Sequence, residues 1–349
     1  MEYPKVAIII LNWNGWEDTI ECLESLNQIN YPDYEVIIVD NDSKNDSIEK
    51  IKEYCKGDIK VESDFVKFNP ENKPLKVIEF TREESEKVKI AKELIEIPSD
   101  RKITLIKNDT NAGFPEGCNI GMRYALNQDI EYLLLLNNDT VVDKEFLKEL
   151  VDVADTDPQI GILGSKIYFY NHPNILQAAG GKIRWNLGII STYKGEDKGQ
   201  YEEIKERDYV YGTSLLMKKE VIDKISFMDS YFFFGVEEYD YCTKAIRSGF
   251  KVIYVPKSKV WHKSGGSSKN LEDYPETYEF IKKNAGRNYN KYLYELFRRH
   301  GKPVLFVFSY GMCVLDRRFL EKYWWLTKRF FVLLKRGETD KIVNFIKTR

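Results

Sequence analysis

Four short polar clusters each follow an apolar run of the kind that forms a buried strand. The clusters occupy residues 12–15, 40–43, 108–113 and 137–139. Turn formation is an ordinary role for any one of them. The carboxyl ends of parallel strands, however, meet at one edge of the sheet, where ligands bind. Four such clusters in succession therefore predict a binding site assembled at that edge.

Asp139 is the carboxylate of this set best placed to hold a cation. It ends the apolar run 132–136, and hard divalent cations bind oxygen ligands, often one or two carboxylates together with substrate phosphates. An isolated aspartate after a strand is more commonly a helix cap. The segment 111–121 carries three glycines but has no P-loop lysine and no GxGxxG pattern, so we expect close approach of a substrate or backbone there rather than a dinucleotide motif.

An acidic cluster at residues 237–240 opens a predicted helix. Glu237 and Asp240 share one face, where acids interact favourably with the helix dipole. Glu238 points elsewhere and follows the aromatic run 231–234. Burial beside aromatic rings would raise the pKa of this carboxyl and suit it to act as a general base. Glu237 is the alternative.

Alternating apolar and amphipathic segments in the first 140 residues must position these side chains. Strand-like runs at 6–11, 36–39, 103–106 and 132–136 alternate with helical patterns, which predicts a parallel sheet with right-handed crossovers. Residues 55–100 interrupt this rhythm. We expect an elaboration there without chemistry of its own, comprising a hairpin (60–68 with 76–80) and a surface helix (84–96). A helix is expected over 117–126, short strands over 160–217, and a helix over 237–247 that ends at Gly249.

Together these segments resemble the family 2 glycosyltransferases, in particular the branch containing rhamnosyltransferase-like enzymes of surface polysaccharide assembly. The resemblance covers about residues 5 to 290 and rests on the order of segments 10–14, 39–43, 111–121, 136–139, 212–214, 232–249 and 261–262. It implies a GT-A fold, an α/β, Rossmann-like domain with a mostly parallel sheet and helices on both faces. We expect this catalytic domain over residues 1–270 and a helical region over 271–349.

The resemblance also implies site roles. Trp13 would lie against the base of a nucleoside diphosphate sugar, with Asp40 and Asn41 reading the edge of the base. Asp139 would close the family's Asp-x-Asp metal motif, in which Asn137 replaces the first aspartate, so Mg²⁺ or Mn²⁺ would need oxygens of the diphosphate. The family's base is an aspartate at the position of Glu238, and the implied reaction inverts the anomeric carbon.

The expected roles divide among three groups of residues. The nucleotide-sugar-binding residues would be Asn12, Trp13, Asn14, Asp40, Asn41, Ser43, Asn111, Gly113, Asn119, Asn138, Gly212 and Arg287, the metal ligands Asp139 and His262, and the catalytic acids Glu238 and Glu237. A lone histidine is more often structural, but a family histidine at this position coordinates the metal or contacts diphosphate. The Gly/Ser stretch 263–268 would be a mobile loop that closes over the donor.

Composition limits the other function classes. The net charge of −2 argues against a general nucleic-acid binder. Five scattered cysteines favour reduced thiols and a cytoplasmic location. The first residues run directly into an apolar strand, so we expect no secretory signal, and no apolar run reaches the ~18–20 residues of a membrane span.

Residues 298–349 have a different character, because basic residues outnumber acidic ones there by roughly three to one and aromatic residues are interspersed among them. Such a tail suits a helix at a membrane interface, here the inner face of the cell membrane. The alternative is a helical hairpin packed on the catalytic domain or on the second subunit of a homodimer.

The substrates implied by the resemblance are a dTDP- or UDP-linked sugar such as rhamnose and a hydroxyl of a glycan or lipid-linked acceptor. Because Asn137 and Glu238 depart from the family pattern, a non-catalytic sugar-nucleotide-binding subunit of a glycan assembly complex is the alternative. A nucleotidyltransferase would need a basic, Gly-rich signature after the first strand, and residues 12–16 do not supply one.

Overall fold

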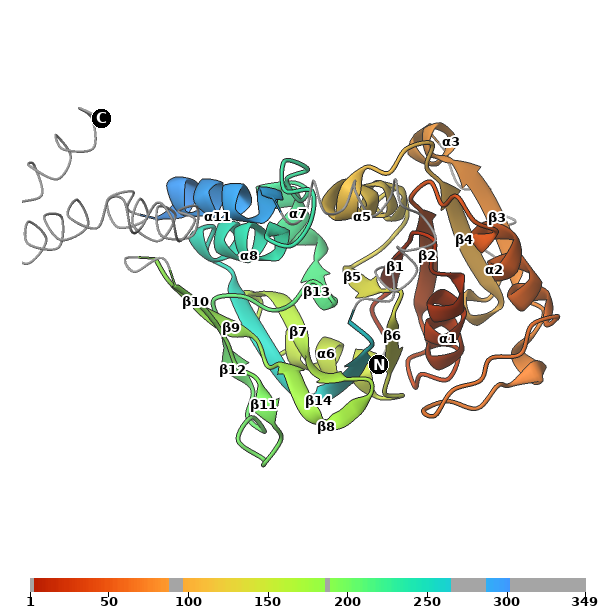
Figure 1. Cartoon of the computed structure of the whole chain (residues 1–349), viewed down its shortest axis with the longest axis horizontal. Coiled ribbons are helices and arrows are strands. Elements are labelled where there is room, and N and C mark those ends of the chain that lie inside the picture. The colour runs from red at the N-terminus through yellow and green to blue at the C-terminus, as the bar shows by residue number, and fades with distance from the viewer. Residues whose placement is uncertain (1–2, 88–96, 186–188, 265–286, 302–349) are drawn as a thin grey trace, which may run out of the picture. The chain divides into compact units, whose positions relative to one another are not determined.

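The computed structural model of the chain describes residues 3–87, 97–185, 189–264 and 287–301 (Figure 1). The chain divides into two units. The first comprises residues 1–183 with 190–285, and the second residues 184–189 with 286–349. The first unit contains a 12-stranded sheet, whose strand ends bear the polar clusters predicted to form the site.

One half of the sheet is parallel and confirms the predicted α/β alternation. Its strands lie side by side in the order β5-β1-β2-β4-β3 (Figure 1). Their bounds are β1 (Val6–Asn12), β2 (Tyr34–Asp40), β3 (Lys76–Thr81), β4 (Lys102–Lys107) and β5 (Tyr132–Asn137). Because β1, β2 and β5 are covered on both faces, their sequences are almost continuously apolar.

The other half is mainly antiparallel and begins where β13 pairs with β5. From there the order runs β13-β7-β8-β11, and β14 runs parallel to β7 and also pairs with β6 and β12. The bounds are β6 (Thr140–Val142), β7 (Ile160–Phe169), β8 (His172–Ala178), β11 (Gly195–Glu196), β12 (Lys205–Glu206), β13 (Ser214–Lys218) and β14 (Lys251–His262). A separate two-stranded sheet pairs β9 (Gly181–Arg184) with β10 (Ile189–Thr192).

Helices cover both faces of the sheet. Those of the first unit are α1 (Trp16–Leu26), α2 (Ser47–Lys56), α3 (Arg82–Lys87), α5 (Gly113–Ala125), α6 (Phe146–Ala154), α7 (Lys219–Ile225) and α8 (Glu237–Arg247). Ile8 and Ile10 share a core with residues of α1, α2 and α6. On the opposite face α5 lies so close to β1 that a Cβ at Gly117 would come within 2.4 Å of Leu11. The helix therefore needs glycine at this contact.

Residues 55–100, expected to form an elaboration of the domain, differ in structure from the prediction. Residues 60–68 contain no strand, so the predicted hairpin is wrong, and β3 pairs instead in parallel with β4 at the edge of the sheet. Phe65 packs on Tyr170 and Trp261, with ring centroids 4.7 and 4.9 Å apart. The apolar side chains of this segment thus find partners on the domain rather than on a hairpin strand. Of the helix predicted over 84–96, α3 is seen and residues 88–96 lie outside the described part.

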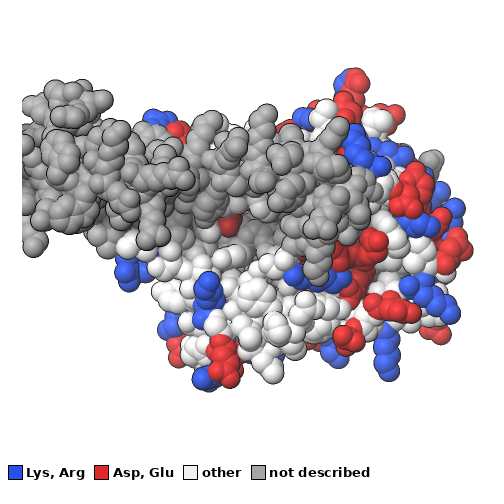
Figure 2. Space-filling model, viewed as in Figure 1, with Lys and Arg blue, Asp and Glu red and all other residues white. Residues whose placement is uncertain are grey.

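The second unit contributes one described helix, α11 (Arg287–His300), where Trp185 and Phe297 meet edge to face with ring centroids 5.4 Å apart. The basic aromatic tail beyond Gly301 and the Gly/Ser stretch beyond Ser264 lie outside the described residues. In the parts of the chain that are described, no helix has the length and apolarity to cross a bilayer. On the face shown in Figure 2, charged side chains of both signs are interspersed where the residues are coloured.

Candidate functional site

Side-chain hydrogen bonds among Asn12, Asp40 and Ser43 join the ends of β1 and β2. Asn12 Nδ2 donates to Asp40 Oδ2 at 2.6 Å, and Ser43 Oγ donates to the same oxygen at 2.7 Å. Asp40 and Asn12 are register partners, so strand pairing places the two side chains together. Asp40 is 1% exposed, and both of its carboxylate oxygens accept hydrogen bonds, from Asn12 and Ser43. The role that this geometry gives Asp40 is to shape the loops at the strand ends.

The loop after β1 is held by hydrogen bonds to the loop after β2. The Asn14 N–H donates to Ser43 Oγ at 2.9 Å, and Asn14 Oδ1 accepts from the Lys44 N–H at 2.7 Å. Asn14 has a φ of 53°, a left-handed conformation that asparagine tolerates better than most residues. Trp13, between Asn12 and Asn14 in the chain, is half-buried.

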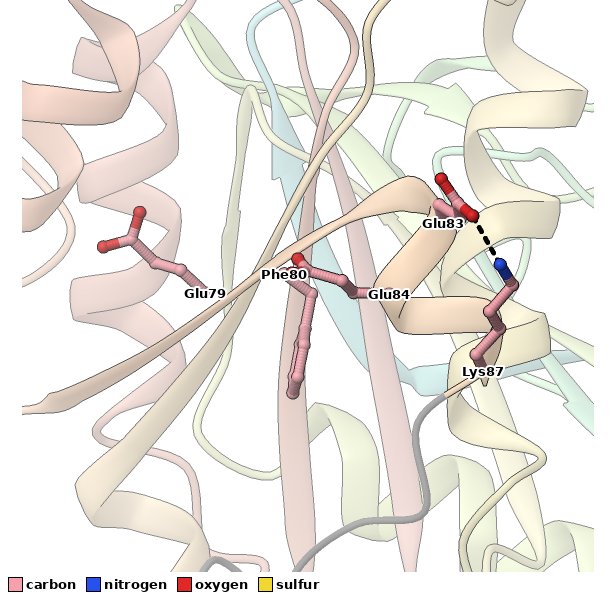
Figure 3. Close-up of a pocket in the computed structure, with 5 residues that line it drawn as sticks. All are labelled: Glu79, Phe80, Glu83, Glu84 and Lys87. Carbon is pink, nitrogen blue, oxygen red and sulfur yellow. Dashed lines mark hydrogen bonds and ion pairs between the residues drawn. The ribbon is translucent and has the colours of Figure 1, made fainter.

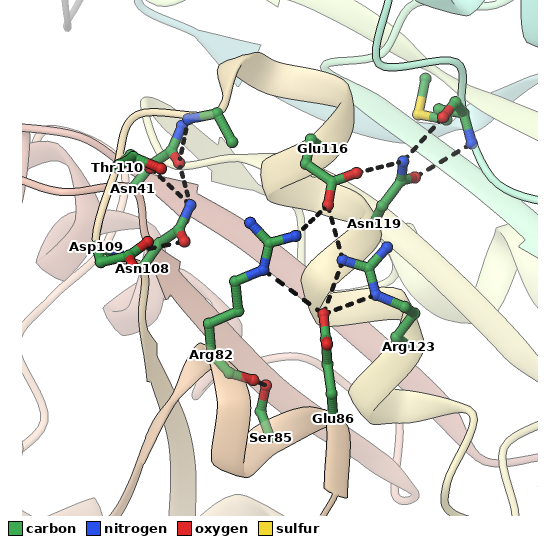
Figure 4. A network of polar contacts seen from close by, with 12 residues as sticks. Asn41, Arg82, Ser85, Glu86, Asn108, Asp109, Thr110, Glu116, Asn119 and Arg123 are labelled. Atoms are coloured by element: carbon green, nitrogen blue, oxygen red, sulfur yellow. Dashed lines mark hydrogen bonds and ion pairs between the residues drawn. The ribbon is translucent and has the colours of Figure 1, made fainter.

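Asn41 is the centre of a second network at the ends of β2 and β4 (Figure 4). Its Oδ1 accepts from Asn108 Nδ2 at 3.0 Å and from the Ala112 N–H at 3.1 Å. Its Nδ2 donates to Asn111 Oδ1 at 3.0 Å, and Asn111 Oδ1 also accepts from the Gly113 N–H at 3.0 Å. Asn41 thus fixes the turn into α5, and Asn108, which the sequence placed in a polar cluster without a role of its own, belongs to this network.

Gly113 brings this turn against the segment that precedes α8. Its φ is 81°, and a Cβ there would lie 2.7 Å from the Phe233 carbonyl oxygen and 2.7 Å from its ring. The Phe114 N–H donates to that carbonyl at 2.9 Å. Further along the same helix, Asn119 donates to the Met228 carbonyl at 2.8 Å and accepts from the Met228 N–H at 3.1 Å. Both amide atoms of Asn119 are therefore used to hold the same segment.

A charged network on the outer side of α5 supports this helix (Figure 4). Glu116 Oε1 accepts from Arg82 at 2.7 Å and from Arg123 at 2.8 Å. Arg82 belongs to α3, so the elaboration is tied by ion pairs to the helix that carries the Gly113 turn.

Asp139 and His262 meet at the end of β5, as the metal prediction requires. His262 Nε2 lies 3.0 Å from Asp139 Oδ1 and 3.3 Å from Asn137 Nδ2. The other ring nitrogen, Nδ1, lies 2.7 Å from Gln177 Oε1 on β8. Asn138 points away from this pair and donates to the Gly15 carbonyl at 3.2 Å and to Thr19 Oγ1 at 3.1 Å.

These residues fit a divalent cation as a partial ligand set. Asn137 Oδ1 is buried and has no hydrogen-bond partner among the described residues. A buried amide oxygen, a carboxylate and an imidazole nitrogen are all ligand types that Mn²⁺ accepts. Within the described residues no cluster of three or more His, Cys, Asp and Glu side chains surrounds a cation position. The remaining ligands would have to come from diphosphate oxygens and water.

Glu237 and Glu238 are buried at the start of α8, with 5% and 7% exposure. Glu237 Oε2 accepts from the Val236 N–H, just before the helix begins, at 2.8 Å. Burial raises the pKa of Glu237. Burial, together with the negative charge of Glu237, raises the pKa of Glu238 well above its usual range. The two neighbouring acids thus differ, because Glu237 is bound to the backbone while Glu238 gains a proton affinity suited to a base.

Gly212 and Thr213 lie between Glu238 and the end of β5. A Cβ added at Gly212 would lie 4.0 Å from Glu238 Cβ and 3.7 Å from the Phe114 ring. The next residue, Thr213, accepts at its carbonyl oxygen from the Asn137 N–H at 3.0 Å. Residues 212 and 213 therefore lie between Glu238 and the end of β5, within the first unit.

The last predicted residue, Arg287, begins α11 in the second unit, and its side chain lies outside the described part. Sequence reasoning also did not assign a role to Gln177 or Thr19. Thr19 Oγ1 donates to Asn12 Oδ1 at 2.9 Å. Its position one helical turn after the first polar cluster was the available signal.

A depression of about 530 Å³ lies elsewhere, between β3 and α3 (Figure 3). Its carboxylates have structural partners. Glu83 pairs with Lys87, Glu79 pairs with Lys52 and Lys107, and Glu84 accepts from the N–H and hydroxyl of Thr81. The contacts between Thr81 and Glu84 form a capping box at the start of α3. The depression therefore has no charged group that awaits a ligand.

Comparison with known families decides the identity of this arrangement. A model described as "Glycosyltransferase like family 2" matches residues 66–290, and one described as "Glycosyl transferase family 2" matches residues 7–75. The chain belongs to glycosyltransferase family 2. The predicted resemblance and the GT-A fold are thereby confirmed.

Two curated members of the family match about half of the chain. The low-salt glycan biosynthesis hexosyltransferase Agl10 of Haloferax volcanii is 25% identical over 161 residues, 43% of this chain and 48% of its own length. The dTDP-rhamnosyl transferase RfbF of Shigella flexneri is 24% identical over 172 residues, 48% of this chain and 54% of its own length. The match thus spans about half the length of each relative.

Two solved structures share the fold. GalNAc-T7, solved with UDP, GalNAc and Mn²⁺, matches 75% of this chain and 44% of its own, with a TM-score of 0.51 and 16% identity. The mannosyltransferase PcManGT of Pyrobaculum calidifontis, solved with GDP-Man and Mn²⁺, matches 100% of this chain and 81% of its own, with a TM-score of 0.53 and 13% identity.

Proposed function

We propose that the chain is an inverting glycosyltransferase that moves a sugar from a nucleoside diphosphate sugar to a hydroxyl of a glycan or lipid-linked acceptor. The observation that carries the proposal is a buried Glu238 with a raised pKa beside Gly212, whose neighbour Thr213 is hydrogen-bonded to Asn137 at the strand end that precedes the Asp139–His262 pair. Inverting transfer needs a base for the acceptor hydroxyl and stabilisation of the charge on the leaving diphosphate, and these residues could supply both.

The donor would be a dTDP- or UDP-linked sugar, with rhamnose as a candidate. This follows the activity named for the Shigella relative, a dTDP-rhamnosyl transferase, and the UDP present in the GalNAc-T7 structure. Trp13 would stack on the base, and the loops fixed by Asp40 and Asn41 would enclose its edge.

In the reaction, Glu238 accepts the proton of the acceptor hydroxyl as the oxygen attacks the anomeric carbon from the face opposite the diphosphate. Its raised pKa gives the carboxylate the proton affinity to do so. Asp139, His262 and Asn137 Oδ1 would hold Mg²⁺ or Mn²⁺. When bound, this cation supplies electrostatic stabilisation to the leaving diphosphate.

Calorimetric titration with UDP, dTDP and GDP, each with and without Mn²⁺, tests the donor site. We expect one nucleotide to bind in a Mn²⁺-dependent manner and Asp139→Asn to lose that dependence. Absence of binding to all three would contradict the proposal. Turnover of the selected donor, with inverted product configuration by NMR, distinguishes an enzyme from a non-catalytic subunit, and a retained configuration would exclude Glu238 as an inverting base.

The basic, aromatic tail is proposed to hold the catalytic domain close to its acceptor, either by packing on protein or by binding the inner face of the cell membrane. Flotation of the full chain and of a chain truncated after Gly301 with anionic liposomes separates these roles. Lipid binding that is unchanged by the truncation would reject the tail as a membrane contact.

A further inference from the structure

Gln177 makes a contact to His262 that the proposed roles leave unused. It belongs to β8, in the antiparallel half of the sheet, 85 positions before His262 in the chain. Its Oε1 lies 2.7 Å from His262 Nδ1, and its Nε2 donates to Ser264 Oγ at 3.1 Å. Both amide atoms are thus used, the oxygen toward the ring and the nitrogen toward the hydroxyl.

An acceptor at Nδ1 favours the tautomer in which Nδ1 carries the proton. With Nδ1–H donated to Gln177, the neutral imidazole has its lone pair on Nε2, where it can accept from Asn137 Nδ2 at 3.3 Å. Nε2 also lies 3.0 Å from Asp139 Oδ1, and the other amide atom, Asn137 Oδ1, is buried without a partner among the described residues. Two electron-pair donors in contact, Nε2 and Asp139 Oδ1, are stabilised by a cation between them.

Lys263, the residue after His262, holds the end of β14 in place. The Lys263 N–H donates to the Asp139 carbonyl at 2.9 Å, and the Lys263 ammonium pairs with Asp18 and Glu21 of α1 at 2.5 Å each. These contacts fix the backbone at the end of β14 but not the rotation or the tautomer of the His262 ring. Gln177 contacts Nδ1 of this ring and so influences both.

We propose that Gln177 is a positioning residue for cation binding, which holds His262 as the Nδ1–H tautomer with Nε2 directed at the cation. The inference rests on the proposed function, since it assumes that Asp139 and His262 bind a divalent ion. A metal-ligating histidine typically donates its second N–H to a carbonyl or carboxylate, and removal of such a partner weakens metal binding by about 10- to 100-fold.

The test uses two substitutions in the full chain, one that removes the acceptor oxygen and one that keeps it. Gln177→Leu removes the oxygen that faces Nδ1, whereas Gln177→Glu retains it. The chain has three histidines, so long-range ¹H–¹⁵N spectra can report each imidazole tautomer without metal, with the exposed His172 as an internal reference. We expect the Nδ1–H form of His262 in the parent and in Gln177→Glu, and its loss in Gln177→Leu.

Mn²⁺ affinity is measured in parallel by electron paramagnetic resonance, in the presence of UDP, dTDP or GDP in turn. We expect Gln177→Leu to bind Mn²⁺ about 10- to 100-fold more weakly than the parent and Gln177→Glu to remain within a few-fold of it. Circular dichroism and the unfolding midpoint establish that each variant is folded, and if Gln177→Leu is not, Gln177→Asn, whose shorter side chain withdraws the oxygen from Nδ1, takes its place.

Two outcomes overturn the inference and differ from each other. Parent-like Mn²⁺ affinity in a folded variant that lacks the acceptor would show that Gln177 does not position the ligand, while the proposed function stands. A parent chain that binds no Mn²⁺ with any nucleotide would remove the metal site itself, and the proposed metal dependence would fail with it.

Discussion

At the scale of single residues, the two adjacent acids of α8 are expected to behave differently. Glu237→Gln keeps a side-chain oxygen that can accept from the Val236 N–H, whereas Glu238→Gln removes the group with the higher proton affinity. We expect Glu238→Gln to lower kcat by about 10²- to 10⁴-fold and Glu237→Gln to have a much smaller effect. Steady-state kinetics with the selected donor measures both, and equal losses would contradict the assignment of Glu238 as the base.

The raised pKa of Glu238 also predicts how stability depends on pH. The folded state binds this proton more tightly than the unfolded chain, whose carboxyl titrates near 4.5. Stability from this group is therefore fully present below pH 4.5 and is lost as pH rises toward the folded pKa. We expect Glu238→Gln to be more stable than the parent at pH 8, with the difference shrinking toward pH 4.5. Urea unfolding at several pH values checks this, and a constant difference would contradict the raised pKa.

At the scale of elements, the turn into α5 depends on glycine. A Cβ at residue 113 would require strain at φ 81° and a close approach to the Phe233 carbonyl. We expect Gly113→Ala to destabilise the chain by about 1–3 kcal/mol and to weaken nucleotide binding. The matched control is Gly212→Ala, whose Cβ would make ordinary contacts at 3.7 to 4.0 Å. Denaturant unfolding compares the two, and equal stabilities would contradict the argument.

The elaboration is docked by a buried ion pair. Lys73 Nζ lies 2.8 Å from Glu24 Oε2, and both side chains are at most 3% exposed, with the ammonium also 4.3 Å from the centre of the Tyr54 ring. Removal of one partner leaves a buried charge, so Lys73→Met should cost about 3–5 kcal/mol. Adding Glu24→Gln should recover part of this loss, and Lys76→Met on an exposed side chain should change little. Additive effects of the Lys73 and Glu24 changes would contradict the coupling.

At the scale of the whole molecule, donor binding should stabilise the folded chain. A ligand at 100 times its dissociation constant adds about 2.7 kcal/mol. We expect the cognate nucleotide to raise the melting temperature further when Mn²⁺ is added, and Asp139→Asn to remove only the Mn²⁺-dependent part. Differential scanning fluorimetry measures this. An Mn²⁺-dependent increase that persists in Asp139→Asn would place the cation elsewhere.

The sequence by itself determined four of the five strands of the parallel half of the sheet, β1, β2, β4 and β5, and the polar clusters at its edge. Strands covered on both faces must be continuously apolar, so the runs 6–11 and 132–136 match β1 (Val6–Asn12) and β5 (Tyr132–Asn137) within one residue. The predicted helix 237–247 coincides with α8, since acids at its start and a glycine after its end mark both limits.

The tertiary structure alone decided how the polar side chains meet. Nothing local to Gln177 indicates His262, because their contact depends on the pairing of β8 and β14 with β7, and a slip of one residue would turn either side chain to the other face. For the same reason β3 could be expected as a strand but not as the parallel neighbour of β4. Periodicity records which face of an element is buried, whereas the partner across that face is set by register over long separations in the chain.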